Sequence, residues 1–356
     1  MEKNFFNNPK NSKYKNIKIY DNDITKNNFN KNFYEKRKCI ILIVLLALNM
    51  NIYILKAKKF VNSLTLSNFD LNFKYELFES EIITDKIKDK SGWLLKTEEA
   101  YFINGILRRH RPKNCLELGV AEGGSSILIL NAISDINNSV LISIDLNKKL
   151  SLNRKKETGF RVTKYFPELT KKWKLYTGAF PHEFLSRINI KYDFLFLDTA
   201  HVTPGEIINF IEVLPFLNEN AIIIIHDILW QFHNRLPIKF YPSNLILFTS
   251  IFGEKIILTN NGHFKNVGAI FLYSNQKKYY LNYFLLLYTI WEYIPNNNDL
   301  KKLRIFIKNY YKNEVYIKNF DSAVKLNKNF FNNHRNGSKF RYTAKYNKII
   351  KQKLAI

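Results

Sequence analysis

Cysteine is almost absent from this sequence: Cys39 and Cys115 are the two cysteines among 356 residues. Each lies inside or beside an apolar run, so the sequence predicts no disulfide framework and favours a reducing compartment. Paired cysteines with zinc-ligand spacing are missing, and so is the G-x-S-x-G elbow of serine hydrolases. The sequence therefore excludes a structural zinc site built from paired cysteines, and it excludes a serine hydrolase with a G-x-S-x-G elbow.

Acidic residues are also scarce, with 30 Asp and Glu against 55 Lys and Arg and a formal net charge of +25. Lysine and asparagine concentrate toward both ends of the chain, so we attribute much of this charge to overall composition and expect no nucleic-acid partner. A basic surface still favours anionic partners such as lipid headgroups, nucleic acids or acidic glycans.

The chain is long enough for one large domain with appendages, and its 46% hydrophobic content is ample for a core. We expect four parts along the chain. The first two are a Lys/Asn-rich disordered arm over residues 1–38 and an apolar helix over residues 39–60. The others are a catalytic domain over residues 90–275 and a C-terminal helical extension with a basic tail over residues 276–356.

Residues 39–55 form the most apolar segment, with lysine and arginine on both sides. The run is at the short limit for a membrane-spanning helix, and Asn49 and Asn51 within it would each need a hydrogen-bond partner in lipid. Two interpretations stay open: a membrane anchor, or a buried or dimer-forming helix. We expect a cytoplasmic protein, with membrane association through 39–55 as an alternative.

Beyond residue 94, short apolar runs alternate with helical patterns. The predicted strands cover residues 114–118, 140–146, 174–177, 192–198, 221–227, 255–258 and 267–273. The predicted helices cover residues 98–109, 124–133, 204–217, 276–293 and 299–312. Strands that are apolar on both faces and alternate with helices predict a doubly wound α/β fold, with a mostly parallel seven-stranded sheet between helix layers.

The segment 116–126, LELGVAEGGSS, leads from a predicted strand through a glycine-rich turn into a helix. Such a turn gathers free backbone N–H groups and the positive end of a helix at one point. Gly119 and Gly123 stand four apart, which departs from the G-x-G-x-x-G fingerprint of dinucleotide-binding turns. The spacing argues against a pyrophosphate ligand and favours a nucleoside cofactor without phosphates, S-adenosylmethionine (SAM).

Four of the predicted strands end in an acidic residue, at Glu117, Asp145, Asp198 and Asp227. In an open parallel sheet, ligands bind at the carboxyl ends of the strands, so these side chains are candidates for a site. Asp145 ends the second strand, where a carboxylate can accept hydrogen bonds from both hydroxyls of an adenosine ribose.

On these residues, the segment from about residue 92 to 228 resembles the class I SAM-dependent methyltransferases. It is most similar to the metal-assisted O-methyltransferase branch, which includes macrolide-sugar O-methyltransferases and cephalosporin-type enzymes. The resemblance rests on the Glu117-x-Gly119-x-x-x-Gly123 pattern, on Asp145, and on the stretch GWLLKTEEAYF at 92–102. It implies a Rossmann-like methyltransferase fold and cofactor contacts at Glu117, Gly119, Gly123, Ser125, Asp145 and Gly178.

The resemblance also implies a divalent-metal site with a neighbouring base. Asp198, His226 and Asp227 take the metal positions, with Mg²⁺ as the expected ion, and His201 takes the position of the base, with Asp198 beside it as a catalytic residue. His226 departs from the family, which often has a carboxylate there. An imidazole indicates a weaker site, a softer metal or a contact with the substrate.

This resemblance implies transfer of a methyl group from SAM to a hydroxyl of a sugar or another small polar metabolite. Two alternatives remain. One is a membrane- or surface-associated binding protein that keeps the fold without catalysis, and the other is a nucleic-acid methyltransferase, which charge alone favours. The Asn/Asp-Pro-Pro-aromatic motif of nucleobase N-methylation is missing after the fourth strand.

Overall fold

A computed structural model describes residues 95, 97–150, 153–229, 243–260 and 263–335 of the chain. Seven strands form one sheet in the order β3-β2-β1-β4-β5-β7-β6. The strands are β1 (Asn114–Leu118), β2 (Val140–Asp145), β3 (Trp173–Thr177), β4 (Tyr192–Leu197), β5 (Leu217–His226), β6 (Gly253–Asn260) and β7 (His263–Leu272).

Strands β1 to β5 pair in parallel, whereas β7 runs antiparallel to both β5 and β6. The sheet turns direction at β1, because β2 and β3 lie on one side of it and β4 and β5 on the other. These findings confirm the predicted doubly wound, mostly parallel seven-stranded sheet. The carboxyl ends of β1, β2, β4 and β5 consequently share one edge, which is where ligands bind in such sheets.

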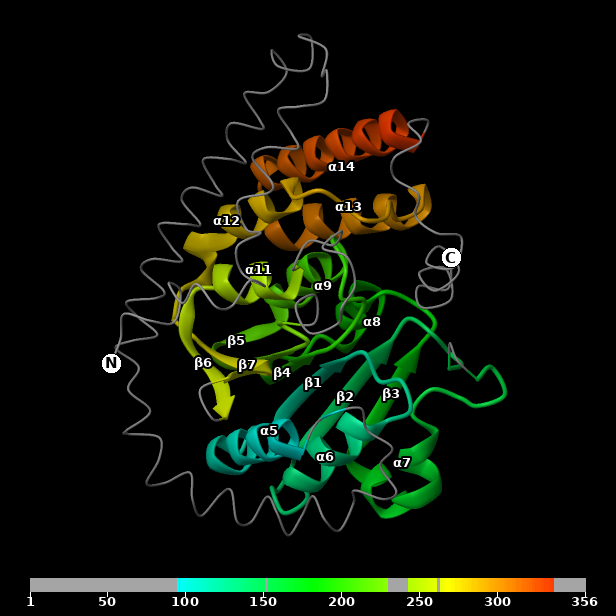
Figure 1. The fold of residues 1–356 in the computed structure, drawn as a ribbon, viewed down its shortest axis with the longest axis vertical. Helices are drawn as coiled ribbons and strands as arrows, with labels where there is room; N and C mark the ends of the chain where they lie inside the picture. The colour runs from blue at the N-terminus through cyan, green and yellow to red at the C-terminus, as the bar shows by residue number, and fades with distance from the viewer. Residues whose placement is uncertain (1–94, 96, 151–152, 230–242, 261–262, 336–356) are drawn as a thin grey trace, which may run out of the picture. The chain divides into compact units, whose positions relative to one another are not determined.

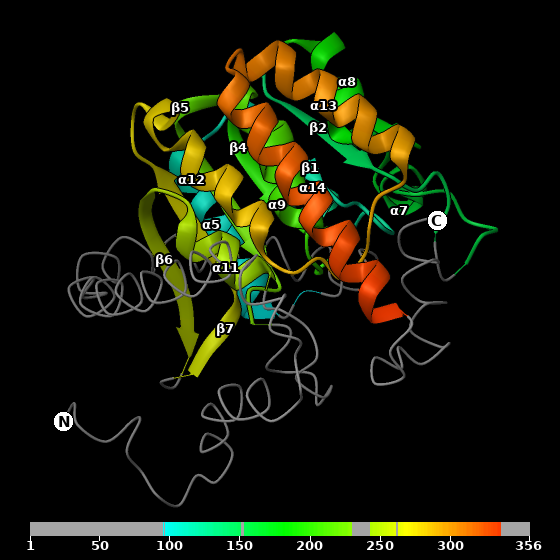
Figure 2. The ribbon, with the colours of Figure 1, turned by 90° about the horizontal axis from the view of Figure 1, so that it is seen from above.

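Helices cover both faces of the sheet, as Figure 1 shows. One face carries α5 (Thr97–His110), α6 (Gly124–Ala132) and α7 (Phe160–Tyr165). The other carries α8 (Pro181–Ile188), α9 (Gly205–Val213), α11 (Ser243–Ser250), α12 (Tyr280–Leu285), α13 (Asn297–Tyr311) and α14 (Glu314–Arg335). Figure 2 shows α13 and α14 as neighbours on the outside of this second layer.

Each helix layer has its own apolar core against the sheet. Side chains of α5 and α6, such as Phe102 and Ile129, are buried beneath one face. On the other face, Phe210 of α9 and Trp291, Phe306 and Phe320 from the C-terminal part are buried together. Burying a large apolar side chain contributes about 1.5–3 kcal/mol, so the C-terminal helices stabilise the sheet that carries the strand ends.

The helical stretch predicted over 276–293 consists of three short elements in the structure. They are the 3₁₀ turn η4 (Gln276–Tyr279), α12 and a second 3₁₀ turn, η5 (Leu286–Tyr288). The last helix, α14, continues to Arg335 and so includes part of the Lys/Asn-rich end of the chain.

Within the part of the chain that the structure describes, no helix has the length and hydropathy needed to cross a membrane. The segment 39–55, for which we kept a membrane anchor as one interpretation, lies outside the described residues.

Candidate active site

The glycine turn after β1 lies directly against the end of β4. Gly119 has φ +86°, and a Cβ there would lie 1.9 Å from the backbone oxygen of Asp198. The Asp198 N–H donates to the Leu118 carbonyl at 3.0 Å. Gly123, with φ +97°, precedes α6, and a Cβ there would lie 3.2 Å from Gly159 Cα. Backbone packing therefore requires glycine at position 119, where it brings Asp198 to the turn, and the left-handed backbone favours glycine at position 123.

Asp145, at the end of β2, holds the other side of this turn. Its Oδ2 accepts the N–H groups of Val120 at 2.9 Å and Ala121 at 3.1 Å. Its Oδ1 accepts the Asn147 N–H at 2.8 Å. Each carboxylate oxygen offers two lone pairs, so Oδ1 retains capacity to accept a ligand hydroxyl. The carboxylate thus lies at the glycine turn, where the sequence predicted it.

Glu117 is fully buried in β1, and its oxygens accept hydrogen bonds from three serines. Ser125, Ser126 and Ser143 each donate to it at 2.6 Å. Burial raises the pKa of Glu117 to about 7, although the three hydrogen bonds oppose this shift. Glu117 therefore connects the start of α6 to β1 and β2 through hydrogen bonds. The contacts with SAM that we expect of Glu117 and Ser125 stay predictions.

Gly178 follows β3 and extends the same edge of the sheet. Its N–H donates to the Asp145 carbonyl at 3.0 Å, and its φ is +89°. A Cβ at this position would lie 2.4 Å from Cε of Lys148. The strand ends of β2 and β3 are therefore joined beside the glycine turn.

Asp198, His201 and Asp227 converge at the ends of β4 and β5. His201 Nε2 lies 3.5 Å from Asp198 Oδ1 and 3.2 Å from Asp227 Oδ2. One ligand atom from each of the three residues lies within 4.8 Å of the others. His201 is buried, whereas the two carboxylates are partly exposed. The cluster adjoins the glycine turn through Asp198.

Two members of this cluster have backbones in the left-handed region, His201 with φ 57° and Asp227 with φ 55°. Such conformations are uncommon for residues other than glycine and collect at functional sites, where the surrounding structure holds them. Here they turn both side chains toward the edge of the sheet.

His226, the last residue of β5, is buried with each ring nitrogen facing carboxylates. Nδ1 lies 3.3 Å from Asp198 Oδ2 and 3.6 Å from Asp227 Oδ1, and Nε2 lies 3.4 Å from Glu99 Oε2. Burial alone lowers the pKa of His226, but Asp198, Glu99 and Asp227 together outweigh it and raise this pKa well above its usual value.

Two buried glutamates from helices, which the sequence analysis missed, support the histidines. Glu99 of α5 approaches His226, as described above, and also accepts the Asn266 N–H at 3.3 Å. Glu206 of α9 accepts the backbone N–H of His201, and its Oε1 lies 3.8 Å from His201 Nδ1. Burial raises the pKa of Glu206, although His201 opposes the shift. In the sequence, the available signal was that each glutamate lies on an otherwise apolar face of a helix.

The donor set fits a divalent cation. Asp198, His201 and Asp227 each offer one ligand atom within 4.8 Å of the others, and Nδ1 of His226 faces the same two carboxylates. Nδ1 of His226 is buried and faces both carboxylates, which makes it a candidate ligand atom. Carboxylate oxygens suit Mg²⁺ and Mn²⁺, whereas imidazole suits borderline ions such as Fe²⁺ and Zn²⁺.

The residues that carry this geometry match a known family. Residues 116–228 fit a family model described as a methyltransferase domain. Residues 116–228 are thus similar to a methyltransferase domain, as the sequence predicted. The order of the strands agrees with the predicted fold.

Solved structures of other methyltransferases are similar to this chain at low identity. The O-methyltransferase TomG from Streptomyces achromogenes, involved in tomaymycin synthesis and in complex with SAM, has 12% identity and a TM-score of 0.39, over 56% of this chain and 90% of that chain. An O-methyltransferase from Bacillus cereus in complex with SAH has 14% identity and a TM-score of 0.38, over 55% and 90%. The SAH-bound methyltransferase PaMTH1 from Podospora anserina has 13% identity and a TM-score of 0.36, over 61% and 95%. No curated protein sequence matches this chain.

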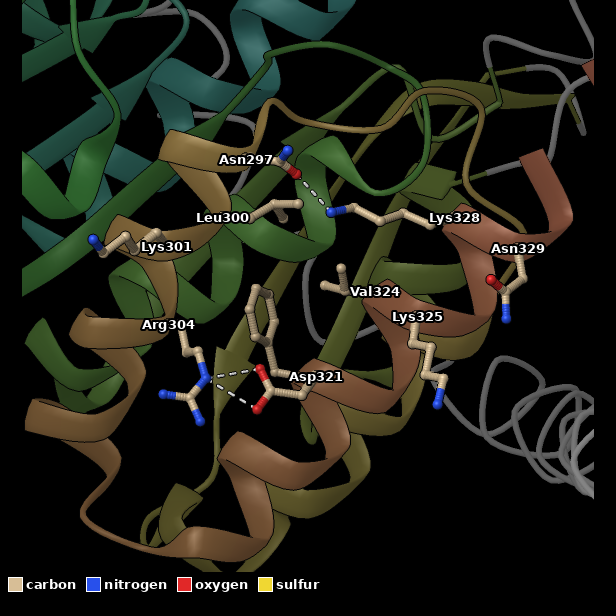
Figure 3. Close-up of a pocket in the computed structure, with 10 residues that line it drawn as sticks. Asn297, Leu300, Lys301, Arg304, Asp321, Val324, Lys325, Lys328 and Asn329 are labelled. Atoms are coloured by element: carbon tan, nitrogen blue, oxygen red, sulfur yellow. Dashed lines mark hydrogen bonds and ion pairs between the residues drawn. The ribbon is translucent and has the colours of Figure 1, made fainter. Parts of the chain in front are cut away.

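Two grooves in the described structure lie away from the cluster of Asp198, His201 and Asp227. One, of about 410 Å³, runs between α13 and α14, as Figure 3 shows. Arg304 bonds Asp321 across it at 2.9 and 3.0 Å, and Lys328 bonds Asn297 at 2.6 Å, so these pairs hold the two helices together. The second, of about 890 Å³, is lined by Lys191 and Leu217 at the starts of β4 and β5, the sheet edge opposite the cluster.

Proposed function

We propose that the chain is a SAM-dependent O-methyltransferase that acts on a hydroxyl of a sugar or another small polar acceptor and uses a divalent metal. The observation that carries this proposal is the convergence of Asp198, His201 and Asp227 beside the glycine turn. The carboxylates of Asp198 and Asp227 and the ring of His201 then lie next to the glycine turn, which is expected to hold SAM.

The cofactor contacts follow from the strand ends. Asp145 is already held at the turn and keeps acceptor capacity on Oδ1, so it is suited to the ribose hydroxyls of SAM. The glycine turn presents the start of α6, whose positive end suits the methionine carboxylate. Gly178 adjoins Asp145 and lies where the adenine would follow the ribose.

The reaction moves a methyl carbon from sulfur to oxygen. A bond forms between the acceptor oxygen and the methyl carbon, the sulfur–carbon bond breaks, and sulfur keeps the electron pair as S-adenosylhomocysteine. A bound divalent cation supplies Lewis acidity that lowers the pKa of the acceptor hydroxyl. Asp198, Asp227 and His226 would hold that cation.

His201 is placed to take the proton of the hydroxyl at Nε2, the nitrogen that faces the carboxylates. The buried carboxylate of Glu206 lies 3.8 Å from Nδ1, where it stabilises the positive charge that the ring then carries.

The substrate class and the location of the protein are parts of the same proposal. A hydroxyl with a pKa far above neutrality, as in a sugar, needs both a cation and a base, and the cluster offers groups for each. We propose action in the cytoplasm, and attachment to a membrane through residues 39–55 is the alternative.

The proposal is tested with the full chain in two measurements. Isothermal titration should show binding of SAM to the folded protein. Labelled SAM should then deliver its methyl group to at least one member of a panel of sugars and other hydroxyl compounds when Mn²⁺ or Mg²⁺ is present, and EDTA should stop the transfer. Lack of SAM binding contradicts the cofactor, and transfer unaffected by EDTA contradicts the metal.

A further inference from the structure

The buried glutamate on α5 has a geometric relation to the candidate metal site that the proposed function does not use. Glu99 is 2% exposed, and its Oε2 lies 3.4 Å from Nε2 of His226. It reaches His226 from a helix far away in the sequence and on the opposite side of the ring from Asp198. The ring of His226 is therefore held from both sides.

The position of Glu99 decides which ring nitrogen faces the cluster. A carboxylate at Nε2 favours a proton on that nitrogen, because the N–H can then donate to it. Nδ1 faces Asp198 Oδ2 at 3.3 Å and Asp227 Oδ1 at 3.6 Å, so a bound cation would take the place of a proton on this nitrogen. This is the arrangement of a metal-binding histidine whose second nitrogen donates to a carboxylate.

A second contact keeps the carboxylate in place. Glu99 Oε1 accepts the backbone N–H of Asn266 on β7 at 3.3 Å, and the side chain of Asn266 in turn donates to Asp227. Glu99, Asn266 and Asp227 thus form a connected polar network around the ring of His226. The network joins α5 and β7 to the end of β5, so it fixes the ring relative to the sheet.

We propose that Glu99 is a positioning residue that makes His226 a ligand of the divalent metal through Nδ1. This inference rests on the proposed function, because it requires that a metal binds at Asp198 and Asp227. It also identifies the chemical class of the ion. Two carboxylates with at least one oriented imidazole favour a transition ion such as Mn²⁺, Fe²⁺ or Zn²⁺ over Mg²⁺.

The test measures binding of Mn²⁺ alone to the full-length protein by electron paramagnetic resonance, with no substrate and no turnover. Glu99→Gln keeps the shape and an acceptor oxygen but removes the charge. Its Kd for Mn²⁺ should rise roughly 10- to 100-fold, which is the usual effect of losing a group that hydrogen-bonds a metal-binding histidine. Glu98→Gln, the same change at the adjacent half-buried position, is the matched control and should leave Kd within about threefold.

A double-mutant cycle separates positioning from a general structural role. Because Glu99 acts through His226, Glu99→Gln should have little effect on Mn²⁺ affinity in a protein that already carries His226→Asn. An equal loss in both backgrounds overturns the inference. Unchanged Mn²⁺ affinity of Glu99→Gln in the otherwise wild-type chain overturns it as well.

Folding of each variant is checked by circular dichroism and by titration with SAM. If Glu99→Gln does not fold, Glu99→Asp takes its place, since it keeps the charge and withdraws it from His226. Absence of Mn²⁺ binding by the wild type overturns both this inference and the proposed metal dependence. Binding by the wild type that Glu99→Gln leaves unchanged overturns the inference alone.

Discussion

His201 Nε2 lies 3.2 Å from Asp227 Oδ2, although the two residues follow different strands of the sheet. The parallel pairing of β4 with β5 puts the two strand ends side by side, and the left-handed backbone at each residue turns its side chain into the shared space. Asp198 completes the group and contacts the glycine turn through its backbone. One sheet edge thereby unites the residues expected to bind SAM and those expected to hold the metal.

Replacement of Asp145 by alanine should weaken SAM binding. The variant loses the acceptor for the ribose hydroxyls and also the acceptor that holds the Val120 and Ala121 N–H groups at the turn. Since hydrogen bonds to a charged group contribute about 1.5–3 kcal/mol, the Kd for SAM should rise roughly 10- to 100-fold in isothermal titration.

Asp193 provides a matched control for this change. Its Oδ2 accepts two successive backbone N–H groups, from Lys113 at 3.2 Å and Asn114 at 3.0 Å, in the same manner as Asp145, but at the opposite end of β1. Asp193→Ala should leave the SAM affinity of the folded protein unchanged. Equal losses of affinity in the two variants would show that Asp145 acts through folding alone.

Replacement of Gly119 by alanine should destabilise the fold whether or not SAM is present. The new Cβ would lie 1.9 Å from the Asp198 carbonyl oxygen, and the residue would have to keep a φ of +86°. We expect a loss of more than about 2 kcal/mol in the free energy of unfolding, measured by urea denaturation. Larger residues at this position are therefore poor probes of cofactor binding. A variant as stable as the wild type would contradict the close approach of the turn to β4.

The raised pKa of Glu117 should make stability depend on pH. Its pKa is about 7 in the folded chain against an ordinary value of 4.5, so the folded state holds the proton more tightly than the unfolded state. That contribution is fully present below pH 4.5 and is lost as pH rises toward 7. Relative to Glu117→Gln, the wild type should lose up to about 3 kcal/mol across this range and change little above it.

A serine variant checks the cause of this shift. Ser126 donates to Glu117 at 2.6 Å, and this hydrogen bond opposes the rise in pKa. Ser126→Ala should therefore raise the pKa of Glu117 further and extend the loss of stability to higher pH. Urea denaturation of the three proteins between pH 5 and 9 measures the effect, and parallel curves for wild type and Glu117→Gln would contradict the assignment.

Much of the sheet could be predicted because its signals are local. The run of four isoleucines in β5 and the apolar run in β4 show strands that are buried on both faces, and the acidic residue after each run marks the strand end. Parallel pairing then brings those ends together, which is why Asp198, His201 and Asp227 could be expected to converge.

The contributions from helices could not be predicted in this way. Glu99 and Glu206 reach the two histidines only because α5 and α9 pack on the sheet with particular rotations, and a helical pattern does not contain that information. Asn327 of α14 is a second example. It is 3% exposed, and its side chain bonds backbone groups of Trp291, Leu287 and Ala323, so a Lys/Asn-rich composition concealed a buried helix position.

Methyl transfer by Asp198→Asn tests the central claim most directly. The substitution keeps the shape of the side chain but removes the charge that faces both His201 and His226. With labelled SAM, a hydroxyl acceptor that the wild type methylates and added Mn²⁺, the rate should fall roughly 100-fold or more, while isothermal titration still shows SAM binding. A variant that binds SAM and transfers the methyl group at the wild-type rate would contradict the assignment of this cluster as the catalytic centre.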